Sequence, residues 1–354
     1  MRHITYQRAA MADDAVLSDI RHYYGETLQS SADLQTNACC LDAEPPQWLK
    51  DILREIHPEV LARFYGCGSP IPPALSGCTV LDLGCGTGRD CYVLSKLAGP
   101  QGRVIGVDMT EQQLAVAREY QAWHAEKFGF ANTEFRQGYI EDLSGIPDNS
   151  VDVIVSNCVI NLSPAKERVF SECLRVLKPG GEIYVSDVFA DRRVPEALSR
   201  DPILRGECLS GALYLEDFRR LLLQCGVADY RVLSRAPVTV NNPQLQERLG
   251  NIRFESITFR AFKLALEDRC EDYGQIAIYK GGIPQQSSAF RLDDHHYFEQ
   301  GRPVLVCGNT ADMLAGSRFG RYFEILGEKR THFGLFDCAP PSSAPAAPTG
   351  GSCC

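Results

Sequence analysis

The chain lacks the features that mark several protein classes. Its 354 residues include no basic run, and their formal net charge of −9 disfavours a nucleic-acid-binding surface. No apolar stretch reaches the length needed to cross a membrane. The N-terminal segment also lacks the apolar core of a signal peptide. We therefore expect a cytoplasmic protein without nucleic-acid or membrane partners.

Two cysteine patterns are also missing. The chain has 15 cysteines, an odd number, and no Cys-x-x-Cys pair, which argues against a zinc ribbon. Their density is far below that of a disulfide scaffold. In a reducing compartment such thiols pack as small apolar groups, bind metals or metalloids, or carry redox chemistry. Cys173 and Cys225 fall on expected helical faces, where we expect them only to pack.

Short apolar segments alternate with amphipathic ones in the middle of the chain. The helices expected between the strands include Arg89–Leu97 and one that runs from Thr110 to about Lys127. This alternation predicts an α/β, Rossmann-like fold with a doubly wound, mostly parallel sheet and right-handed crossovers. The expected strands are Thr79–Leu83, Val104–Val107, Thr133–Gln137, Val151–Asn157 and Glu182–Asp187.

Composition changes suggest where the chain divides. Pro70, Pro72 and Pro73 precede the first expected strand, the strand–helix rhythm changes from about Ala236, and Ala339–Gly351 has the composition of a disordered tail. The expected division is an N-terminal cap at 1–73, a core at 74–235 with a lid loop at 191–215, a smaller C-terminal extension at 236–338, and a disordered tail at 339–354.

The most informative motif is the glycine series Gly84, Gly86 and Gly88, which directly follows Thr79–Leu83. Without a Cβ atom, such a loop allows the backbone to approach a ligand closely. Asp108 ends the next strand, roughly 20 residues further on, where nucleotide-binding α/β units place the carboxylate that accepts ribose hydroxyls. The spacing is neither G-x-G-x-x-G nor a P-loop. It resembles the first motif of the S-adenosylmethionine-dependent methyltransferases.

The remaining cofactor candidates follow from the position of ligands in open α/β sheets, beyond the carboxyl ends of the strands. Ile140 is a candidate to cover the adenine. Glu141 either accepts from the adenine amino group or is a solvated loop acid. The candidate S-adenosylmethionine-binding residues are Asp82, Gly84, Gly86, Gly88, Asp108, Met109, Ile140, Glu141 and Asn157.

Cysteines surround the predicted sulfonium end of this pocket. Cys158 follows the fourth strand, while Cys39, Cys67 and Cys208 lie in loop segments, the last two beside glycines. Several thiols around one methyl donor favour a soft, thiophilic acceptor. Oxygen or nitrogen acceptors normally need a general base, and none of the seven histidines lies near the predicted pocket.

Four segments carry a family resemblance, and so does the core around the glycine series. They are Gln35-Thr-Asn-Ala-Cys39, Tyr65-Gly-Cys67-Gly68, Ser156-Asn-Cys158-Val-Ile-Asn-Leu162 and Gly206-Glu-Cys208. Together they resemble the arsenite S-adenosylmethionine methyltransferases over roughly residues 18–270, and the later segments look like the C-terminal extension of that family. The resemblance implies a class I methyltransferase fold.

The resemblance also implies roles for these thiols in arsenic detoxification. Cys39, Cys67, Cys158 and Cys208 are the implied catalytic residues. Trivalent arsenic, free or as a thiol conjugate, is held by Cys158 and Cys208, with Cys67 as a candidate third thiolate. A Cys39–Cys67 dithiol returns the methylated arsenic to the trivalent state, and thioredoxin or glutathione reduces the resulting disulfide. The tandem Cys39-Cys40 leaves the choice of N-terminal thiol open. A monomer is the expected state.

Two other functions remain compatible with the residues alone. The first is a methyltransferase for an organic acceptor such as a sterol or quinone, in which the loop thiols are incidental. The second is a non-catalytic metalloid sensor that binds arsenite without turnover. The activity of cysteine variants distinguishes these two functions from arsenite methylation.

Overall fold

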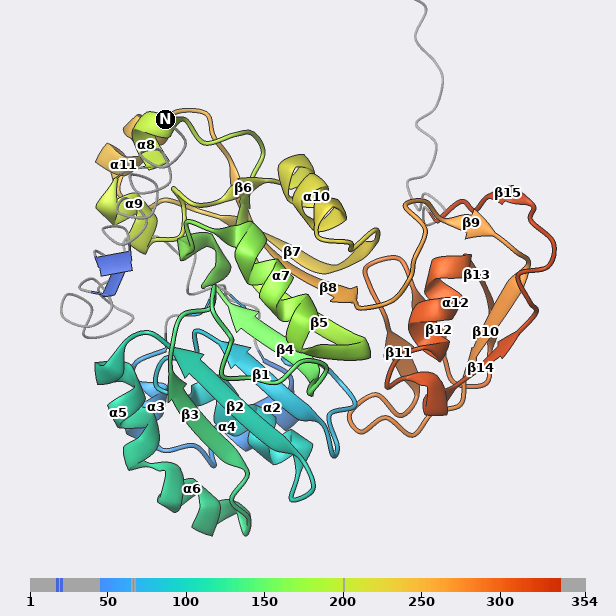
Figure 1. Cartoon of the computed structure of the whole chain (residues 1–354), viewed down its shortest axis with the longest axis horizontal. Coiled ribbons are helices and arrows are strands. Elements are labelled where there is room, and N and C mark those ends of the chain that lie inside the picture. Colours follow the sequence, from blue (N-terminus) through green and yellow to red (C-terminus); the bar gives the residue numbers. More distant parts are fainter. Residues whose placement is uncertain are drawn as a thin grey trace, which may run out of the picture.

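The computed structural model describes residues 17–18, 20–21, 45–64, 66, 68–199 and 201–338. Its main element is an eight-stranded sheet in the order β3-β2-β1-β4-β5-β8-β7, with β6 pairing to β5 (Figure 1). The strands are β1 (Thr79–Leu83), β2 (Arg103–Asp108), β3 (Thr133–Gln137), β4 (Val151–Asn157), β5 (Leu177–Ala190), β6 (Leu213–Tyr214), β7 (Tyr230–Val238) and β8 (Phe254–Phe262).

The central strands of this sheet run parallel. Leu81 of β1 lies opposite Ile105 of β2 on one side and Ile154 of β4 on the other. β4 continues in parallel to β5, whereas β8 is antiparallel to β5 and β7 is antiparallel to β8. β4 is almost entirely buried, which explains its nearly continuous apolar sequence. The predicted doubly wound, mostly parallel α/β fold is confirmed.

Helices cover both faces of the sheet. One core joins β1 and β4 to α2–α5 and the other joins β4 and β5 to α7 and α10. None of the helices within the described segments is long and apolar enough to cross a membrane. The helices are α2 (Gln47–Leu53), α3 (Pro58–Leu61), α4 (Arg89–Ala98), α5 (Glu111–Glu119), α6 (Gln121–Phe128), α7 (Lys166–Val176), α8 (Glu196–Ser199), α9 (Pro202–Gly206), α10 (Leu215–Gln224), α11 (Pro243–Leu249) and α12 (Gly308–Ala315), with 3-10 turns at Ile160–Leu162 and Gly320–Tyr322.

Three elements differ from the sequence-based expectation. The helix predicted from Thr110 to about Lys127 is interrupted at Tyr120, whose ψ of 7° departs from helical geometry, so that α5 and α6 are separate. β5 extends the predicted Glu182–Asp187 strand at both ends. The large sheet also continues past the boundary expected at residues 235 and 236, because β7 crosses that point and β8 lies between β5 and β7. The change of rhythm there marks a change of strand direction rather than the end of the sheet.

The segment expected to be a lid lies over the carboxyl end of β5. α8 and α9 are followed by β6, which pairs with β5 through Phe189 and Leu213. Leu204 and Leu209 of this segment pack in one apolar cluster with residues of α11 and β8. The expected lid segment is therefore packed against the rest of the core.

A smaller unit follows β8 and packs to one side of the large sheet (Figure 1). Its apolar core gathers around Tyr279, Phe290 and Phe319. It contains a three-stranded antiparallel sheet in the order β13-β10-β14, the pairs β11–β12 and β15–β9, and α12. Its strands are β9 (Glu271–Asp272), β10 (Gln275–Tyr279), β11 (Ala289–Arg291), β12 (Tyr297–Glu299), β13 (Pro303–Val306), β14 (Phe323–Leu326) and β15 (Gly334–Leu335).

A buried ionic cluster fastens this unit to the sheet. Glu182 of β5 accepts from Arg260 Nε of β8 at 2.5 Å, and both side chains are fully buried. Its second carboxylate oxygen pairs with Arg318 of the smaller unit. Arg260 also donates to the carbonyl of Leu292 at 2.9 Å. The same carboxylate therefore holds the large sheet and the C-terminal unit together.

Candidate functional site

A pocket opens where the order of the sheet reverses. β1 and β4 are neighbours, but the chain between them builds β2 and β3 on the far side of β1. Ligands of open α/β folds bind beyond the carboxyl ends of the strands at such a point. The predicted residues that line this pocket are Asp82, Gly84, Gly86, Asp108, Met109, Ile140, Glu141, Asn157 and Cys158. Gly88 and Cys208 are not among the lining residues.

The backbone of the glycine loop after β1 lies very close to a neighbouring side chain. Gly84 has a φ of +71°, and a Cβ there would lie 2.1 Å from Val159 Cγ2. Any side chain at this position would therefore displace the turn after β4. Gly88 instead caps the N-terminus of α4 with a φ of 84°. Its role in the structure is to start that helix.

Asp108 lies where a ribose-binding carboxylate is expected. One oxygen accepts from Gly86 N at 2.9 Å and the other from Thr110 N at 2.8 Å. Burial raises the pKa of Asp108 above its usual value. Hydrogen bonds from the Thr110 and Gly86 backbone, from the Thr110 side chain and from the Met109 backbone oppose this shift, so the carboxylate is held in place at the pocket.

Asp82 lies beneath the loop and is only 2% exposed. Its carboxyl accepts from Cys91 Sγ at 3.2 Å. Burial, followed by the neighbouring Asp90 carboxylate, raises the pKa of Asp82 to about 8. The group is therefore largely protonated at neutral pH and can act as a hydrogen-bond donor or acceptor without bringing charge to the pocket.

Ile140 and Glu141 follow β3 and line the pocket. Glu141 is buried, with only 8% of its surface exposed, so it is not a solvated loop acid. Its Oε1 accepts from Ser163 Oγ at 2.5 Å. Ser163 also lines the pocket, and the pair joins the segment after β3 to the segment that precedes α7.

Asn157 and Asp90 form a polar pair that the sequence interpretation missed. Asn157 Nδ2 donates to Asp90 Oδ2 and to the carbonyl of Gly68, both at 3.0 Å. Within the described residues, no hydrogen-bond donor reaches Asn157 Oδ1 or Asp90 Oδ1, although both atoms are buried. Both residues line the pocket. Asp90 Oδ1 does form an ion pair with Arg89, whose Nε lies 3.8 Å away. The position of Asp90 in the first helical turn after the glycine series was the sequence feature that could have indicated this residue.

Cys158 and Cys208 meet beside this polar pair. Cys158 directly follows β4, and Cys208 follows α9, yet Cys208 Sγ lies 3.2 Å from the carbonyl oxygen of Cys158. Both are almost fully buried, at 2% and 0% exposure, in the apolar cluster that also contains Leu204 and Leu209. The structure therefore brings together two of the predicted arsenic ligands.

A glycine allows the expected lid segment to approach this closely. A Cβ on Gly211 would lie 1.9 Å from the carbonyl oxygen of Asn161. Asn161 is itself fixed, because its backbone N donates to Asp187 at 3.1 Å and its side chain donates to Val188 O at 2.5 Å. The turn after β4 and the segment after Cys208 are thus held against each other through the backbone.

Cys158 is in a disulfide bond, in which none of the other described cysteines takes part. Cys39, Cys40 and Cys67 lie outside the described residues. The neighbours of Cys67 are described, however. A Cβ on Gly66 would lie 2.4 Å from Asn157 Nδ2, and one on Gly68 would lie 2.2 Å from Ser186 Oγ. Gly66 therefore lies against the end of β4, and Gly68 lies against β5.

Lys166 and Asp187 are a second feature that sequence reasoning missed. Lys166 Nζ donates to the carbonyls of Asn161 at 3.1 Å and Ser163 at 2.9 Å. Burial lowers the pKa of Lys166 to about 8, while the charges of Asp187 and Cys208 oppose that shift. Burial also raises the pKa of Asp187 to about 6. Lys166 thus lies close enough to Cys208 and Asp187 for their charges to interact.

Known proteins resemble the chain over nearly its whole length. Two family models match it, "Methyltransferase domain" over residues 74–236 and "Arsenite methyltransferase C-terminal domain" over residues 273–344. An arsenite methyltransferase of Aquipseudomonas alcaligenes is 53% identical over 342 residues, which are 95% of this chain and 99% of that protein. The Homo sapiens arsenite methyltransferase is 44% identical over 331 residues, 91% of this chain and 87% of that protein.

A solved structure agrees with these relatives. The crystal structure of an arsenic (III) S-adenosylmethionine methyltransferase from Chlamydomonas reinhardtii has a TM-score of 0.80 and 48% sequence identity to this chain. The match covers 83% of this chain and 100% of that chain.

Proposed function

We propose, from the premise that the chain belongs to the arsenite methyltransferase family, that it methylates trivalent arsenic held by Cys158 and Cys208. The observation that carries this proposal is the buried pairing of these residues beside the pocket, with Cys208 Sγ 3.2 Å from the Cys158 carbonyl. In the reduced protein, the two thiols in their apolar surrounding suit a soft metalloid.

S-adenosylmethionine is the proposed cofactor, and it supplies an electrophilic methyl group when bound. The residues present fit its three polar regions. Asp108 lines the pocket at the position that suits the ribose hydroxyls, and Glu141 has one oxygen not engaged by Ser163 for the adenine amino group. Asn157 Oδ1 and Asp90 Oδ1 are buried acceptors that suit the ammonium group of the methionine part. Met109 and Ile140 supply apolar walls.

The chain's own contribution to the transfer is positioning and exclusion of water. Cys158 and Cys208 would hold the arsenic at the end of β4, where its lone pair can face the pocket. The apolar cluster around the two thiols keeps water away, so the acceptor is not solvated. Among the described residues that line the pocket there is no histidine, and an arsenic lone pair needs no general base. We keep Cys67 as the proposed third thiolate.

A dithiol relay completes the proposal. Transfer of a methyl cation to the lone pair oxidises arsenic formally by two electrons, and two cysteine thiols can return these electrons by forming one disulfide. We propose that Cys67 takes part in thiol–disulfide exchange with Cys158, because its neighbours Gly66 and Gly68 approach Asn157 and Ser186 closely. Cys39 would exchange with Cys67, and thioredoxin or glutathione would reduce the final disulfide.

The proposal also includes the expected roles of the cap and the lid, the location and the oligomeric state. Residues 1–73 would act as a redox cap and residues 191–215 as a lid over the arsenic. A cytoplasmic location suits the account, because a reducing compartment keeps the thiols available. The protein would act as a monomer on arsenite or its thiol conjugates.

The test is arsenic speciation by chromatography with elemental mass detection. The full chain is incubated with arsenite, S-adenosylmethionine and thioredoxin with its reductase, or with glutathione. We expect methylated arsenic from the wild type. A folded protein that binds S-adenosylmethionine but methylates only a quinone or sterol supports the organic-acceptor function, and one that binds arsenite without product supports the sensor.

The relay has its own test. Cys39→Ser should impair the first methylation of arsenite and spare the methylation of a monomethylated trivalent arsenical. The parallel Cys40→Ser variant decides which of the tandem cysteines acts. If neither variant changes either step, the proposed relay is wrong.

A further inference from the structure

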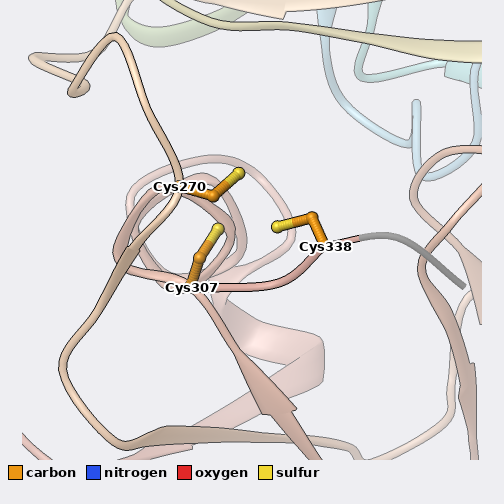
Figure 2. Close-up of side chains that lie close together, drawn as sticks. All are labelled: Cys270, Cys307 and Cys338. Carbon is orange, nitrogen blue, oxygen red and sulfur yellow. The ribbon is translucent and has the colours of Figure 1, made fainter. Parts of the chain in front are cut away.

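Three thiols converge in the C-terminal unit, far from the pocket residues in sequence. The Sγ atoms of Cys270, Cys307 and Cys338 all lie within 4.8 Å of one another. Figure 2 shows the three side chains pointing toward a common space. None of the three is in a disulfide. We call these residues the C-terminal thiol cluster.

Backbone pairing holds the cluster in place. Cys270 directly precedes β9, and β15 pairs with β9 so that Leu335 lies opposite Glu271. Phe336 N then donates to the carbonyl of Cys270 at 2.7 Å. This ladder brings the segment leading to Cys338 beside Cys270. The third thiol comes from the junction of β13 and α12.

Cys307 is the cysteine of the cluster whose surroundings favour the thiolate form. It is fully buried and caps α12, with its Sγ accepting from Thr310 N at 3.4 Å and lying 3.2 Å from Thr310 Oγ1. Arg231 Nη2 lies 3.7 Å from the same sulfur. Hydrogen bonds from the Cys270 and Cys338 thiols, and then the Arg231 charge, lower the pKa of Cys307. The hydrogen bond with Cys307 raises the pKa of Cys270 to about 11.

The positive charge of Arg231 beside the cluster is already matched by carboxylates. Arg231 is 7% exposed, and it pairs with Asp229 at 2.7 Å and with Asp293 at 3.4 Å. A ligand that arrives with its charge neutralised by the thiolates therefore adds no net charge to a buried region. Three thiolates cancel the charge of a trivalent ion, whereas a divalent ion with the same three thiolates leaves one negative charge. The buried region therefore favours the trivalent ion.

We propose that Cys270, Cys307 and Cys338 form a second binding site for trivalent arsenic, separate from the Cys158–Cys208 site. Trivalent arsenic forms three bonds in a pyramid and keeps a lone pair at the fourth position, which matches three converging sulfurs. Zinc normally requires four ligands. Within the described residues, no fourth histidine, cysteine, aspartate or glutamate completes the cluster.

Binding is an exchange of ligands without redox chemistry. Arsenous acid and three thiols give one tris-thiolate arsenic and three waters, so three As–S bonds form as three As–O bonds break. Each thiol proton leaves with a hydroxide as water. Cys270 and Cys338 are half-buried, which gives the arsenite access, and Cys307 closes the site from within. The bound arsenic would crosslink the ends of β9, α12 and β15. This site goes beyond the proposed methylation and does not depend on it.

The experiment isolates the second site in the full chain. The starting protein is the Cys158→Ser/Cys208→Ser variant that also carries serine for Cys39, Cys40, Cys67, Cys353 and Cys354. It is reduced, desalted without oxygen and incubated with arsenite alone, and the arsenic per chain is measured by elemental mass spectrometry after gel filtration. We expect one arsenic per chain, with three sulfur neighbours by arsenic X-ray absorption.

Single variants of the half-buried members then test the assignment. Adding Cys338→Ser or Cys270→Ser should remove the third sulfur neighbour and lower the arsenite affinity at least tenfold. The matched control is Cys225→Ser, another half-buried cysteine, which should leave binding unchanged. Circular dichroism confirms that each variant is folded.

Three results would overturn the proposal. The first is no bound arsenic in the folded starting protein. The second is bound arsenic that Cys338→Ser and Cys270→Ser leave unaltered. The third is stoichiometric zinc in the wild-type protein as purified, lost on Cys270→Ser, which would assign the cluster to a different ion.

Discussion

The thiol of Cys208 donates a hydrogen bond to the backbone carbonyl of Cys158 across 3.2 Å. Both residues have left-handed backbone conformations, with φ values of 60° and 59°. Such conformations are costly for residues other than glycine and persist only where the surroundings enforce them. Here they turn two segments toward one another, so that the end of β4 and the segment after α9 meet at these two cysteines. The position of the expected lid segment is therefore coupled to the backbone at the end of β4.

Replacing Gly211 with alanine tests this coupling. A Cβ there would lie 1.9 Å from the backbone carbonyl oxygen of Asn161, so the segment that carries Cys208 must shift. A displacement on the order of 1 Å at a reacting centre costs about 100-fold in rate. We expect Gly211→Ala to lower the arsenic methylation rate by this order, as measured by product speciation.

The control is Gly145→Ala, whose Cβ would lie at an ordinary 3.7 Å from Arg136 Nη1. It should leave the methylation rate unchanged. If Gly211→Ala retained the wild-type rate, the segment that carries Cys208 would not position the thiol.

Asp108→Ala tests the cofactor site. Hydrogen bonds to a charged group contribute about 1.5–3 kcal/mol, so the loss of ribose contacts should raise the KM for S-adenosylmethionine roughly 10- to 100-fold. Arsenite binding should stay nearly the same, because Asp108 does not reach the thiols. Glu126→Ala, at an exposed acid on α6, is the control for the loss of a negative charge. Equal losses of cofactor and arsenite binding would indicate misfolding and not a ribose contact.

Asp82 should make stability depend on pH. Burial and Asp90 raise the pKa of Asp82 to about 8, from an ordinary value of 3.8. Between these pH values the folded chain keeps a proton that the unfolded chain has released. The resulting contribution to stability is fully present below pH 3.8 and is lost as pH rises through about 8.

The non-titrating variant Asp82→Asn isolates this effect. We expect its melting temperature, relative to that of the wild type, to rise between pH 5 and pH 9, by roughly 2–4 °C per kcal/mol. Differential scanning calorimetry of the unliganded protein measures the difference. A difference that is constant with pH would show that Asp82 does not carry the proton.

Glu182→Gln should destabilise the junction between the sheet and the C-terminal unit. The substitution leaves the fully buried Arg260 and its neighbour Arg318 without their shared carboxylate. Breaking a buried ion pair in this way costs about 3–5 kcal/mol. Guanidinium unfolding, followed by fluorescence, measures the change.

The matched control is Glu134→Gln, which removes a carboxylate from surface pairs with Arg103 and Arg136. Surface pairs contribute up to about 1 kcal/mol, so this variant should be close to the wild type. Equal effects of the two substitutions would mean that the buried cluster does not fasten the unit.

Local sequence patterns predicted the parallel part of the fold because their causes are local. The apolar stretch Val151–Asn157 is buried on both faces, and the glycine series starts α4 and opens the pocket. β8 was not predicted because its Arg260 is buried and charged, and its burial depends on Glu182 of a distant strand. No window of sequence contains both residues.

In the candidate site too, some residues were predicted from local sequence patterns and others were missed. Asp108 was predicted from its spacing to the glycines, and it lies at the pocket. Asn157 was predicted, but its partner Asp90 was missed, because the pair depends on how α4 lies against β4. The C-terminal thiol cluster was missed for a similar reason, since each cysteine comes from a different strand or helix end. The roles of Cys39 and Cys67 stay predictions that depend on the resemblance.

The most direct measurement is arsenic methylation by the pre-reduced Cys158→Ser and Cys208→Ser variants, with Cys225→Ser as the control. The account predicts that both test variants bind S-adenosylmethionine with wild-type affinity and form no methylated arsenic, whereas Cys225→Ser keeps full activity. Methylation of arsenite at the wild-type rate by Cys208→Ser would contradict the account, because the arsenic would then not be held by the Cys158–Cys208 pair.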